Sequence, residues 1–546
     1  MIHRNVSEIH PLRTLRAVAL TLIASSFGAF AGLIPQAASA APAPEVRVHQ
    51  GKLQGKDLGG GISAFLGIPF AAAPTGALRW QLPQRAVSWS GERPAIRYGP
   101  ACTQDRTGYG GLFAKSQSED CLYLNLWSPD LKPKKRMPVM VYLHGGGFTG
   151  GAGTIPSFDG IALAKQGVIT VTVNYRLGVF GFFAHPALST ESSHKASGNY
   201  GLADQLAALH WVKDNVAAFG GDPTRIIIFG QSAGSINVID LMTSPLTRGL
   251  ISAAIAESGT PLLGGAGTSL VDAEKQGNAF ADAQGESIAQ LRAMSADELM
   301  QRWSKFAASI DARTWPIVDG WVLPKAPADI FAARGEMTIP LMTGNNAREA
   351  LHVPSDTELP QRLRDVFGDA ASRAAALYPA AAPPDPILGS TANMFATDVS
   401  FRCPAEVIET WHAQKGSPVY AYQFEQPLPG REVAGSQHSD EVAFVFGTLD
   451  MMKIMWGGTE VPPPAAKLSD AIVAYWANFA KNGDPNGPGV PPWPRFTTKD
   501  GAYLHLNGTG IRADTRLRAE ACDLYRETAL PRLVTQNVPR EPARIR

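Results

Sequence analysis

The segment Gly230–Gly234 constrains the fold of this chain more than any other. Its sequence, Gly-Gln-Ser-Ala-Gly, follows the apolar run Arg225–Phe229 and precedes Ser235–Met242, which can continue as a helix. A serine on so sharp a turn needs neighbours without bulk, which explains the small residues two positions before and after it. Such a turn exposes the hydroxyl above a helix N-terminus, where negative charge is favoured. The pattern predicts a nucleophile elbow at Ser232, and a plain polar turn is the alternative.

Apolar strand-like runs alternate with helical stretches along the chain. We expect strands at 139–143, 168–175, 225–229, 253–256, 339–343 and 418–424. Residues 202–219 have helical periodicity, which stops at Gly220-Gly221-Asp222-Pro223. Continuous apolar strands separated by helices predict an α/β fold, with a mostly parallel sheet covered by helices on both faces. Ligands of such sheets bind beyond the carboxyl ends of the strands, where Ser232 is expected.

Size and composition are those of a globular protein. The chain has 546 residues, of which 45% are hydrophobic and 18% charged, so it can bury a large core. The net charge of +1 gives no electrostatic reason to expect a nucleic-acid partner. Past the short Pro- and Ala-rich leader at 41–45 we find no long linker and no repeat. Residues 41–546 are therefore predicted to form one domain.

The N-terminus has the order of features of a targeting segment. A basic start is followed by the apolar stretch 17–34 and by Ala38-Ser39-Ala40, which fits the small-x-small cleavage rule. This order predicts a signal peptide at residues 1–40 and an exported protein, periplasmic or secreted. The alternative is a membrane anchor, but the stretch contains serines and glycines and ends at Pro35, which argues against a stable span.

The cysteines suggest disulfides rather than a metal site. An exported chain with four cysteines is typical of disulfide bonding, and four cysteines allow three pairings. We favour Cys102–Cys121, which closes a short loop, and Cys403–Cys522, which ties down the C-terminal region. No cysteine or histidine cluster has the spacing of a zinc or redox site, so we predict no metal.

A glycine-rich loop follows the expected strand at 139–143. Its sequence is His144-Gly145-Gly146-Gly147-Phe148. Without a Cβ, the N–H groups of such residues can approach a ligand closely. We therefore predict that Gly146 and Gly147, with the N–H of Ala233 after the nucleophile, form an oxyanion hole. The alternative is a flexible turn.

Several longer stretches extend the pattern over most of the chain. They are Gly67-Ile68-Pro69-Phe70-Ala71, Leu78-Arg79-Trp80, Glu119-Asp120-Cys121-Leu122-Tyr123-Leu124-Asn125-Leu126-Trp127, Gly198-Asn199-Tyr200-Gly201-Leu202, Phe219-Gly220-Gly221-Asp222-Pro223 and Trp476-Ala477-Asn478-Phe479-Ala480-Lys481. With the elbow, they resemble a type B carboxylesterase, the family that includes the cholinesterases. The resemblance runs from about residue 46 to about residue 525. It implies an α/β-hydrolase fold with inserted specificity loops, and a serine esterase that needs no cofactor.

The resemblance also implies the acid of a catalytic triad. The family places a Glu in a Gly-x-x-x-x-Glu-Gly stretch after a strand, which matches Glu349 in Gly344–Ala350. The residue before this Glu is usually Asp and the next one Gly, so Arg348 and Ala350 depart from the pattern. A carboxylate is needed to hold the imidazole in one tautomer. The alternative is that Glu349 pairs with Arg348 or with solvent.

The implied base is His438. The family's histidine stands three residues before an acid, here Glu441, and ahead of a Phe-Val-Phe run, here Phe444-Val445-Phe446. The chain order Ser232, Glu349, His438 is the order of the α/β-hydrolase fold. We expect Glu441 to be a structural partner rather than a second base. The resemblance implies the same two disulfides that we favour above.

The predicted reaction is hydrolysis of neutral or hydrophobic carboxylic esters through an acyl-enzyme, including larger natural-product or xenobiotic esters with several ester bonds. Cholinesterases have a Glu before the nucleophile and a Trp in the first disulfide loop, whereas this chain has Gln231 and, in the loop, Tyr109 and Phe113. Both departures argue against a quaternary ammonium substrate. The run Met451–Trp456 is a candidate pocket wall, with ordinary packing as the alternative.

Two other functions stay open at this point. Amide or carbamate hydrolysis uses the same triad. Some relatives are non-catalytic adhesion proteins, but these lack the nucleophile that is present here as Ser232. The expected partner is a small-molecule ester, without a stable membrane anchor. The oligomeric state does not follow from the sequence.

Overall fold

The fold is taken from a computed structural model, which describes residues 43–106, 114, 116–264, 267–310, 312–349, 353–380, 382–451 and 460–534. The predicted signal peptide at 1–40 lies outside these residues. So do Tyr109 and Phe113, and all of Met451–Trp456 except Met451.

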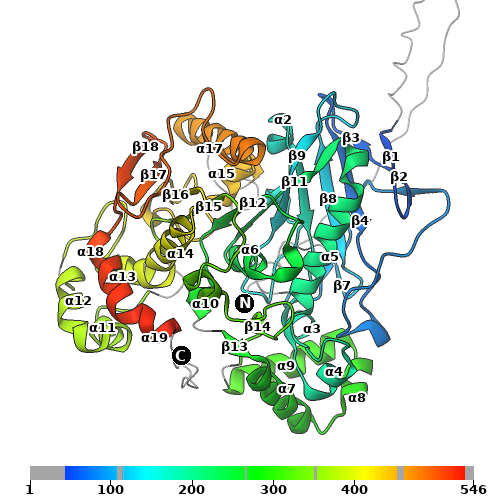
Figure 1. Cartoon of the computed structure of the whole chain (residues 1–546), viewed down its shortest axis with the longest axis horizontal. Helices are drawn as coiled ribbons and strands as arrows, with labels where there is room; N and C mark the ends of the chain where they lie inside the picture. Colours follow the sequence, from blue (N-terminus) through cyan, green and yellow to red (C-terminus); the bar gives the residue numbers. More distant parts are fainter. Residues whose placement is uncertain are drawn as a thin grey trace, which may run out of the picture. The chain divides into compact units, whose positions relative to one another are not determined.

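Eleven strands of the described chain form one mixed sheet (Figure 1). In spatial order they are β18 (Arg512–Thr515), β17 (Ala502–Leu506), β16 (Val419–Phe424), β15 (Leu341–Asn346), β12 (Ala253–Glu257), β11 (Gly221–Gln231), β9 (Met137–Leu143), β10 (Ile169–Val173), β8 (Tyr123–Ser128), β4 (Ser63–Pro69) and β3 (Lys56–Asp57). All neighbours from β17 to β10 pair in parallel, and the antiparallel pairs lie at the two edges. The predicted, mostly parallel sheet is confirmed.

Smaller strands form three further sheets in the described chain. They are β1 (Glu45–Val48), β2 (Gly51–Gln54) and β5 (Glu92–Pro94); β6 (Ala101–Cys102) and β7 (Gln117–Ser118); and β13 (Thr268–Ser269) and β14 (Ile317–Val318).

The helices around the sheet are mostly short. The structure has α2 (Ile161–Lys165), α3 (Gly178–Phe182), α4 (Pro186–Glu191), α5 (Tyr200–Asn215), α6 (Ala233–Thr243), α7 (Leu270–Gln284), α8 (Ile288–Ala293), α9 (Ala296–Ile310), α10 (Pro327–Ala332), α11 (Leu359–Phe367), α12 (Ala371–Leu377), α13 (Thr391–Thr397), α14 (Cys403–Gln414), α15 (Val442–Val445), α17 (Pro463–Asn482), α18 (Ala519–Leu524) and α19 (Leu530–Val534). Within the described ranges, no helix has the length and apolar character needed to cross a membrane.

The central strands are apolar throughout because helices cover both faces of the sheet. Successive side chains of a strand point to opposite faces. In β9, Val139, Val141 and Leu143 belong to the core shared with α5, α6 and α14, whereas Met140 and Tyr142 belong to the core shared with α2, α15 and α17. Figure 1 shows these helices on the two sides of the strands. Burial on both faces explains why the strands were recognisable as continuous apolar runs.

Helix α5 is fixed to the sheet by a buried ion pair. Arg176 follows β10, and its guanidinium donates to Asp204 of α5 through Nε at 2.8 Å and Nη2 at 2.7 Å. The helix continues as a 3₁₀ turn over Val216–Phe219 and ends at Gly220, whose φ of 85° favours glycine. The predicted helix at 202–219 is therefore present, with its last turn tightened.

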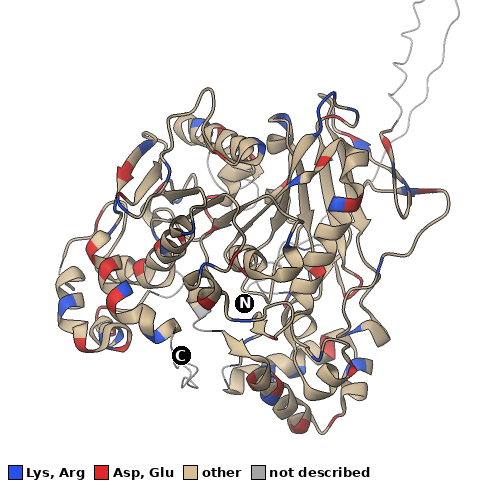
Figure 2. Ribbon diagram, in the orientation of Figure 1, with Lys and Arg blue, Asp and Glu red and all other residues tan. Residues whose placement is uncertain are grey.

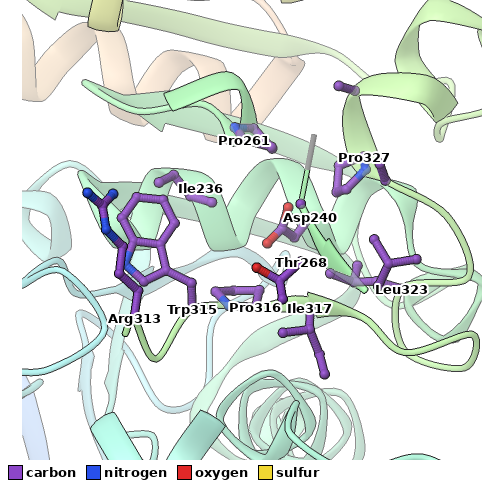
Figure 3. A pocket seen from close by; sticks show the side chains of 14 residues that line it. Ile236, Asp240, Pro261, Thr268, Arg313, Trp315, Pro316, Ile317, Leu323 and Pro327 are labelled. Carbon is purple, nitrogen blue, oxygen red and sulfur yellow. The ribbon is translucent and has the colours of Figure 1, made fainter. Parts of the chain in front are cut away.

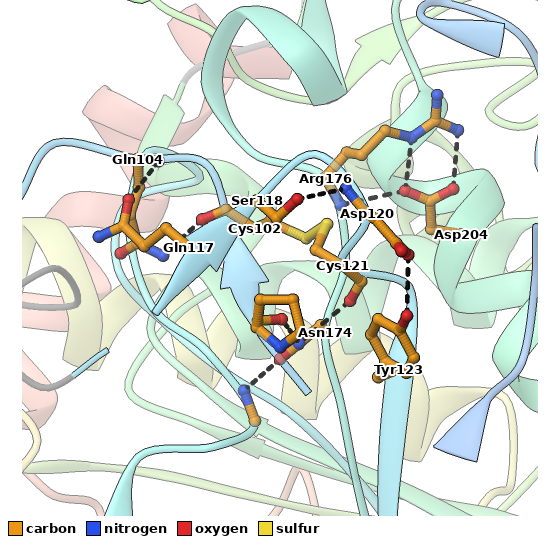
Figure 4. Close-up of a disulfide and its surroundings, with 12 residues drawn as sticks. Cys102, Gln104, Gln117, Ser118, Asp120, Cys121, Tyr123, Asn174, Arg176 and Asp204 are labelled. Atoms are coloured by element: carbon orange, nitrogen blue, oxygen red, sulfur yellow. Dashed lines mark hydrogen bonds and ion pairs between the residues drawn. A yellow bond between two sulfur atoms is a disulfide. The ribbon is translucent and has the colours of Figure 1, made fainter. Parts of the chain in front are cut away.

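The structure contains the two disulfides that the sequence favours, Cys102–Cys121 and Cys403–Cys522. Figure 4 shows the first of them beside Asn174. The Asn174 amide donates to the Pro100 carbonyl at 3.0 Å and to the Cys121 carbonyl at 3.1 Å. The short disulfide loop is thereby fixed to the end of β10.

Helices α7, α8 and α9, which we call the cap helices, are an insertion after β12. They pack around an aromatic cluster in which Phe280 lies 5.1 Å and Phe183 lies 5.7 Å from the Trp303 ring. Figure 2 shows charges of both signs interspersed on these helices and on α11 and α12. Neither positive nor negative side chains dominate the surface of the cap helices. The cap helices match the inserted segments that are expected of this fold.

Candidate active site

Ser232 lies on a strained turn between β11 and α6. Its φ of 58° and ψ of −123° are rare for a residue with a side chain, at a cost of about 1–3 kcal/mol. A Cβ on Gly234 would lie 1.9 Å from the Leu143 carbonyl oxygen, and one on Gly230 would lie 2.6 Å from that of Gly234. Only glycine fits at either position. The strand, turn and helix expected around Ser232 are all present.

Glu349 and His438 form a close hydrogen bond. The Nδ1–H of His438 donates to Glu349 Oε2 at 2.5 Å. Glu349 follows β15 and is fully buried, and its Oε1 accepts from the Asn346 N–H at 2.6 Å. Because Glu349 accepts the proton of Nδ1, the lone pair of the imidazole lies on Nε2. The ring is thus in the tautomer that a general base requires.

The charges around His438 favour its protonated form. Burial lowers the pKa of His438, but the charge of Glu349 and its hydrogen bond raise it, as do Glu441 and Asp440. The net result is a pKa above the ordinary value of 6.5. An imidazolium formed during a reaction would be stabilised in this position.

Glu441 lies behind His438 in a buried polar network. Its Oε1 accepts from the Ser258 hydroxyl at 3.0 Å, and its Oε2 accepts from the Asn346 amide at 2.6 Å. Burial, and then the charge of Glu349, raise the pKa of Glu441 to about 7. Glu441 therefore holds the loops together, the structural role expected from the sequence, while it also influences His438. Across the described ranges, no group of three or more metal-ligating side chains could hold a metal ion.

The sequence did not reveal the contact between Gln231 and His438. The Gln231 side-chain amide Nε2 lies 3.3 Å from His438 Nε2. With the lone pair on Nε2, the amide is the donor of this long hydrogen bond. Within the described part of the chain, the Ser232 hydroxyl makes no hydrogen bond. Catalytic hydrogen bonds often tighten only when substrate is bound. The sequence marked Gln231 as a departure from the cholinesterases but gave no sign of its partner.

The glycine loop lies against the nucleophile. A Cβ on Gly145 would lie 3.1 Å from the Cβ of Ser232. Gly146 and Gly147 have φ values of 116° and 62°, so their N–H groups take directions that other residues rarely adopt. Ala233 is the first residue of α6, and its N–H has no acceptor within the helix. Gly145 and Ala233 therefore adjoin Ser232, Gly146 and Gly147 follow Gly145 in the same loop, and the oxyanion role of Gly146, Gly147 and Ala233 stays a prediction.

His144, the histidine closest to the glycine loop in sequence, is structural. Burial lowers its pKa to about 4, so the ring is neutral near pH 7. It stacks on Tyr175 with 4.3 Å between ring centroids, and the Tyr175 hydroxyl donates to the His144 carbonyl at 2.6 Å. These contacts fix the start of the glycine loop.

Arg348, which departs from the family pattern, does not pair with Glu349. Its guanidinium donates to the carbonyls of Ile387 at 2.9 Å, Pro386 at 2.7 Å and Ala434 at 3.2 Å. Its backbone N–H donates to Ser436 O at 2.9 Å, close to His438 in sequence. Arg348 thus joins the loop that carries the acid to the loop that carries the base.

A cavity of about 310 Å³ adjoins the glycine loop. It is lined by Thr149, by Val179 and Phe180, which follow β10, and by Met300 and Trp303 of the cap helices. Its walls are mostly apolar and aromatic, as in sites for small organic molecules. The cap helices therefore form one wall of this cavity, and none of Ser232, Glu349 and His438 lines it.

Comparisons with known proteins cover most of the chain. The model of the family described as the carboxylesterase family matches residues 42–379 and 385–525. A fumonisin B1 esterase from Sphingopyxis macrogoltabida is 39% identical over 489 residues, which cover 87% of this chain and 88% of that protein. Carboxylesterase 1F from Mus musculus is 34% identical over 543 residues, covering 89% and 94%.

Two solved esterase structures resemble this chain in fold. A PNB esterase has a TM-score of 0.77 at 32% identity, covering 88% of this chain and 99% of that one. The Geobacillus stearothermophilus carboxylesterase EST55 has a TM-score of 0.76 at 30% identity, with 88% and 99% covered.

Proposed function

This chain belongs to the carboxylesterase family and hydrolyses carboxylic ester bonds, and we propose that Ser232, His438 and Glu349 perform this reaction through an acyl-enzyme. The observation that carries the proposal is the 2.5 Å hydrogen bond between Glu349 and His438, on the side of the ring away from Nε2. Nε2 is left to take a proton, and the residue it contacts, Gln231, is the neighbour of Ser232 in the chain.

In the first half of the reaction, Ser232 Oγ attacks the ester carbonyl carbon while His438 Nε2 accepts its proton. The carbonyl oxygen becomes an oxyanion, and the N–H groups of Gly146, Gly147 and Ala233 donate to it. The tetrahedral intermediate then collapses. The C–O bond of the ester breaks, and the alcohol leaves with the proton from His438.

In the second half, a water molecule attacks the acyl-enzyme. His438 accepts a proton from the water, and the same three N–H groups hold the second oxyanion. The bond to Ser232 Oγ breaks, Ser232 regains its proton from His438, and the carboxylic acid leaves. Glu349 stays ionised throughout and stabilises the imidazolium.

We propose that the substrate is a large, mainly apolar natural-product ester with more than one ester bond. One support is the similarity to a fumonisin B1 esterase. A second is the cavity of about 310 Å³ between the glycine loop and the cap helices. Amide or carbamate hydrolysis is not favoured, because the relatives are named as esterases. A purely adhesive role is not supported either, because the sequence contains both Ser232 and His438.

We also propose that the chain is exported, to the periplasm or the medium, after cleavage of residues 1–40, and that residues 41–546 act as one domain. The disulfides Cys102–Cys121 and Cys403–Cys522 are typical of oxidising compartments. Residues Ala43–Arg546 form one compact unit, which supports a single domain.

The test is burst kinetics with p-nitrophenyl butyrate on the purified protein and on Ser232→Ala. The wild type is expected to release p-nitrophenol in a burst, and the variant is expected to lose the burst and at least about 99% of turnover. Ser235→Ala, which removes a buried hydroxyl bonded to the Gly259 carbonyl, is the matched control for folding. A panel of mono-esters, di-esters and anilides then identifies the substrate class. Turnover of anilides alone would contradict the proposal.

A further inference from the structure

The carboxylate of Asp240 faces a cavity that the proposed reaction does not use. Asp240 lies on α6, eight residues after Ser232, and is only 2% exposed. Within the described ranges, its carboxylate has neither a hydrogen bond nor an ion pair. Figure 3 shows the carboxylate directed into the space bounded by Thr268, Trp315 and Pro316. A buried carboxylate without a hydrogen-bond donor is strongly disfavoured, so an occupant of the cavity must supply one.

The cavity around Asp240 has a volume of about 80 Å³, several times the roughly 10–15 Å³ that one water molecule requires. Its walls are mainly apolar and include Ile236, Ile317, Leu323 and Ala328. Thr268 lies at an exposed position of the wall, so the cavity can be reached from solvent. An occupant must therefore combine a short apolar part with a group that satisfies a carboxylate.

We propose that this cavity binds an alkylammonium group, whose N–H bonds donate to the Asp240 carboxylate while its alkyl part contacts the apolar walls. Charge-assisted hydrogen bonds of this kind are among the strongest in proteins. Asp240 also lies in the last turns of α6, where the helix dipole disfavours a negative charge. Burial raises the pKa of Asp240 well above its ordinary value, and no charged side chain of the described residues offsets this effect. An incoming cation supplies the missing opposite charge.

Among the described residues, one cationic side chain lines the cavity, and it does not fill this role. Arg313 is exposed and lies with its guanidinium carbon 5.8 Å from the centre of the Trp315 ring. Figure 3 shows Arg313 on the far side of the Trp315 ring from Asp240. A quaternary ammonium group is a poorer occupant than a primary one, because it has no N–H to donate.

The cavity adjoins the proposed catalytic site. Ile236 lines the cavity and also packs with Ala233, a proposed oxyanion donor, and with Phe148, which follows the proposed donor Gly147. At 1.5 Å per residue, Asp240 lies roughly 12 Å along α6 from Ser232. The ammonium group can therefore belong to an ester substrate or to a separate amine. The first case rests on the proposed function, and the experiment distinguishes the two.

The binding arm needs no catalysis. Titration calorimetry of the purified protein compares hexylammonium with hexanol, and we expect hexylammonium to bind at least tenfold more tightly. Asp240→Asn should remove this preference, and Ala328→Leu should remove binding by filling the cavity. Asp329→Asn, one residue further on and exposed on α10, is the matched control and should leave the affinity unchanged.

The ester arm compares p-nitrophenyl alkanoates whose chains end in an ammonium, a trimethylammonium or a methyl group roughly 12 Å from the carbonyl. A substrate role predicts that kcat/KM for the ammonium ester, relative to the methyl ester, falls at least tenfold in Asp240→Asn and not in Asp329→Asn. If this ratio of kcat/KM values is the same in the wild type and in Asp240→Asn, while hexylammonium still binds through Asp240, the site binds a separate amine.

Two results overturn the proposal. One is equal binding of hexylammonium and hexanol by the wild type. The other is an affinity for hexylammonium that Asp240→Asn and Ala328→Leu leave unchanged. Failure of the proposed function has a different outcome, because the methyl-ended ester would then not be hydrolysed either. If Asp240→Asn fails to fold, Ala328→Leu alone decides the result.

Discussion

The side-chain amide of Gln231 lies 3.3 Å from Nε2 of His438, the nitrogen opposite the one that donates to Glu349. Gln231 is the last residue of β11 and directly precedes Ser232. The side chain at position 231 therefore sets the charge next to Nε2 of His438, on the side of Ser232. In this protein that charge is zero.

Gln231→Glu should increase the preference for cationic esters. A carboxylate at 231 would lie next to the reacting groups and attract a quaternary ammonium substrate. We expect kcat/KM for butyrylcholine, relative to the uncharged 3,3-dimethylbutyl butyrate, to rise about tenfold, or about 1.4 kcal/mol. Gln231→Met, of similar size and uncharged, is the control. An equal ratio in the wild type and the Glu variant would rule out an electrostatic role for position 231.

Glu349→Gln should abolish most of the activity without unfolding the protein. An amide can donate to Nδ1 and so stabilise the tautomer in which Nε2 carries the proton and cannot act as base. We expect kcat for p-nitrophenyl butyrate to fall by about 10³–10⁴. Steady-state kinetics and the denaturation midpoint should be measured together.

The control for this variant is a second buried His–Glu pair. His412 Nδ1 and Glu336 Oε1 are 2.9 Å apart, and both side chains are fully buried. Glu336→Gln should lower the stability and leave kcat within about threefold. If Glu336→Gln reduces kcat as much as Glu349→Gln does, the effect is general destabilisation and Glu349 has no special role.

The activity should fall on the acid side of a midpoint above pH 6.5. His438 accepts a proton only when it is neutral, and its pKa is raised above 6.5 because Glu349, Glu441 and Asp440 together outweigh the effect of burial. Glu441→Gln removes one of these negative charges, so the pKa falls and the acid limb of kcat/KM moves to lower pH. Because the pKa values of Glu441 and Asp440 are also raised to about 7, the wild-type limb reports all three groups. An acid limb that stays in place, or moves to higher pH, would contradict this coupling.

Loss of the Cys403–Cys522 disulfide should destabilise the protein more than loss of Cys102–Cys121. The two bonds close loops with sequence separations of 119 and 19 residues. In the loop-entropy model they contribute about 4–5 and about 3 kcal/mol to the free energy of unfolding. Urea denaturation of the two double serine variants measures this order. The reverse order would show that contacts within the loops, and not chain entropy, dominate.

The sequence predicted most of the sheet because each central strand is buried on both faces. Val139–Leu143 and Ile226–Phe229 lie between two helical layers, so every residue is apolar and the run is visible without any partner. The boundaries were less accurate. β11 begins at Gly221, where its pairing with β9 starts before the apolar run does, and no local signal marks such a pairing.

The site was predicted only as far as local patterns reach. Ser232 and the glycine loop are marked by small residues, because close backbone approaches there exclude a Cβ. The contacts of Gln231 and Glu441 join segments far apart in the chain. The interest of Asp240 lies in a carboxylate that has no partner within the described ranges. Neither kind of information is present in a local stretch of sequence, so both required the structure.

The hydrogen bonds by which Arg348 joins the loop of Glu349 to the loop of His438 matter for the redesign of this enzyme. The Arg348 guanidinium donates to carbonyls of the segments 386–387 and 433–434. Gly435 leaves it room, because a Cβ there would lie 2.6 Å from the Arg348 side chain. Grafting either segment alone from another protein would break these hydrogen bonds of Arg348 and displace His438. Libraries that vary substrate range should therefore exchange both segments as one module and keep Gly435 constant.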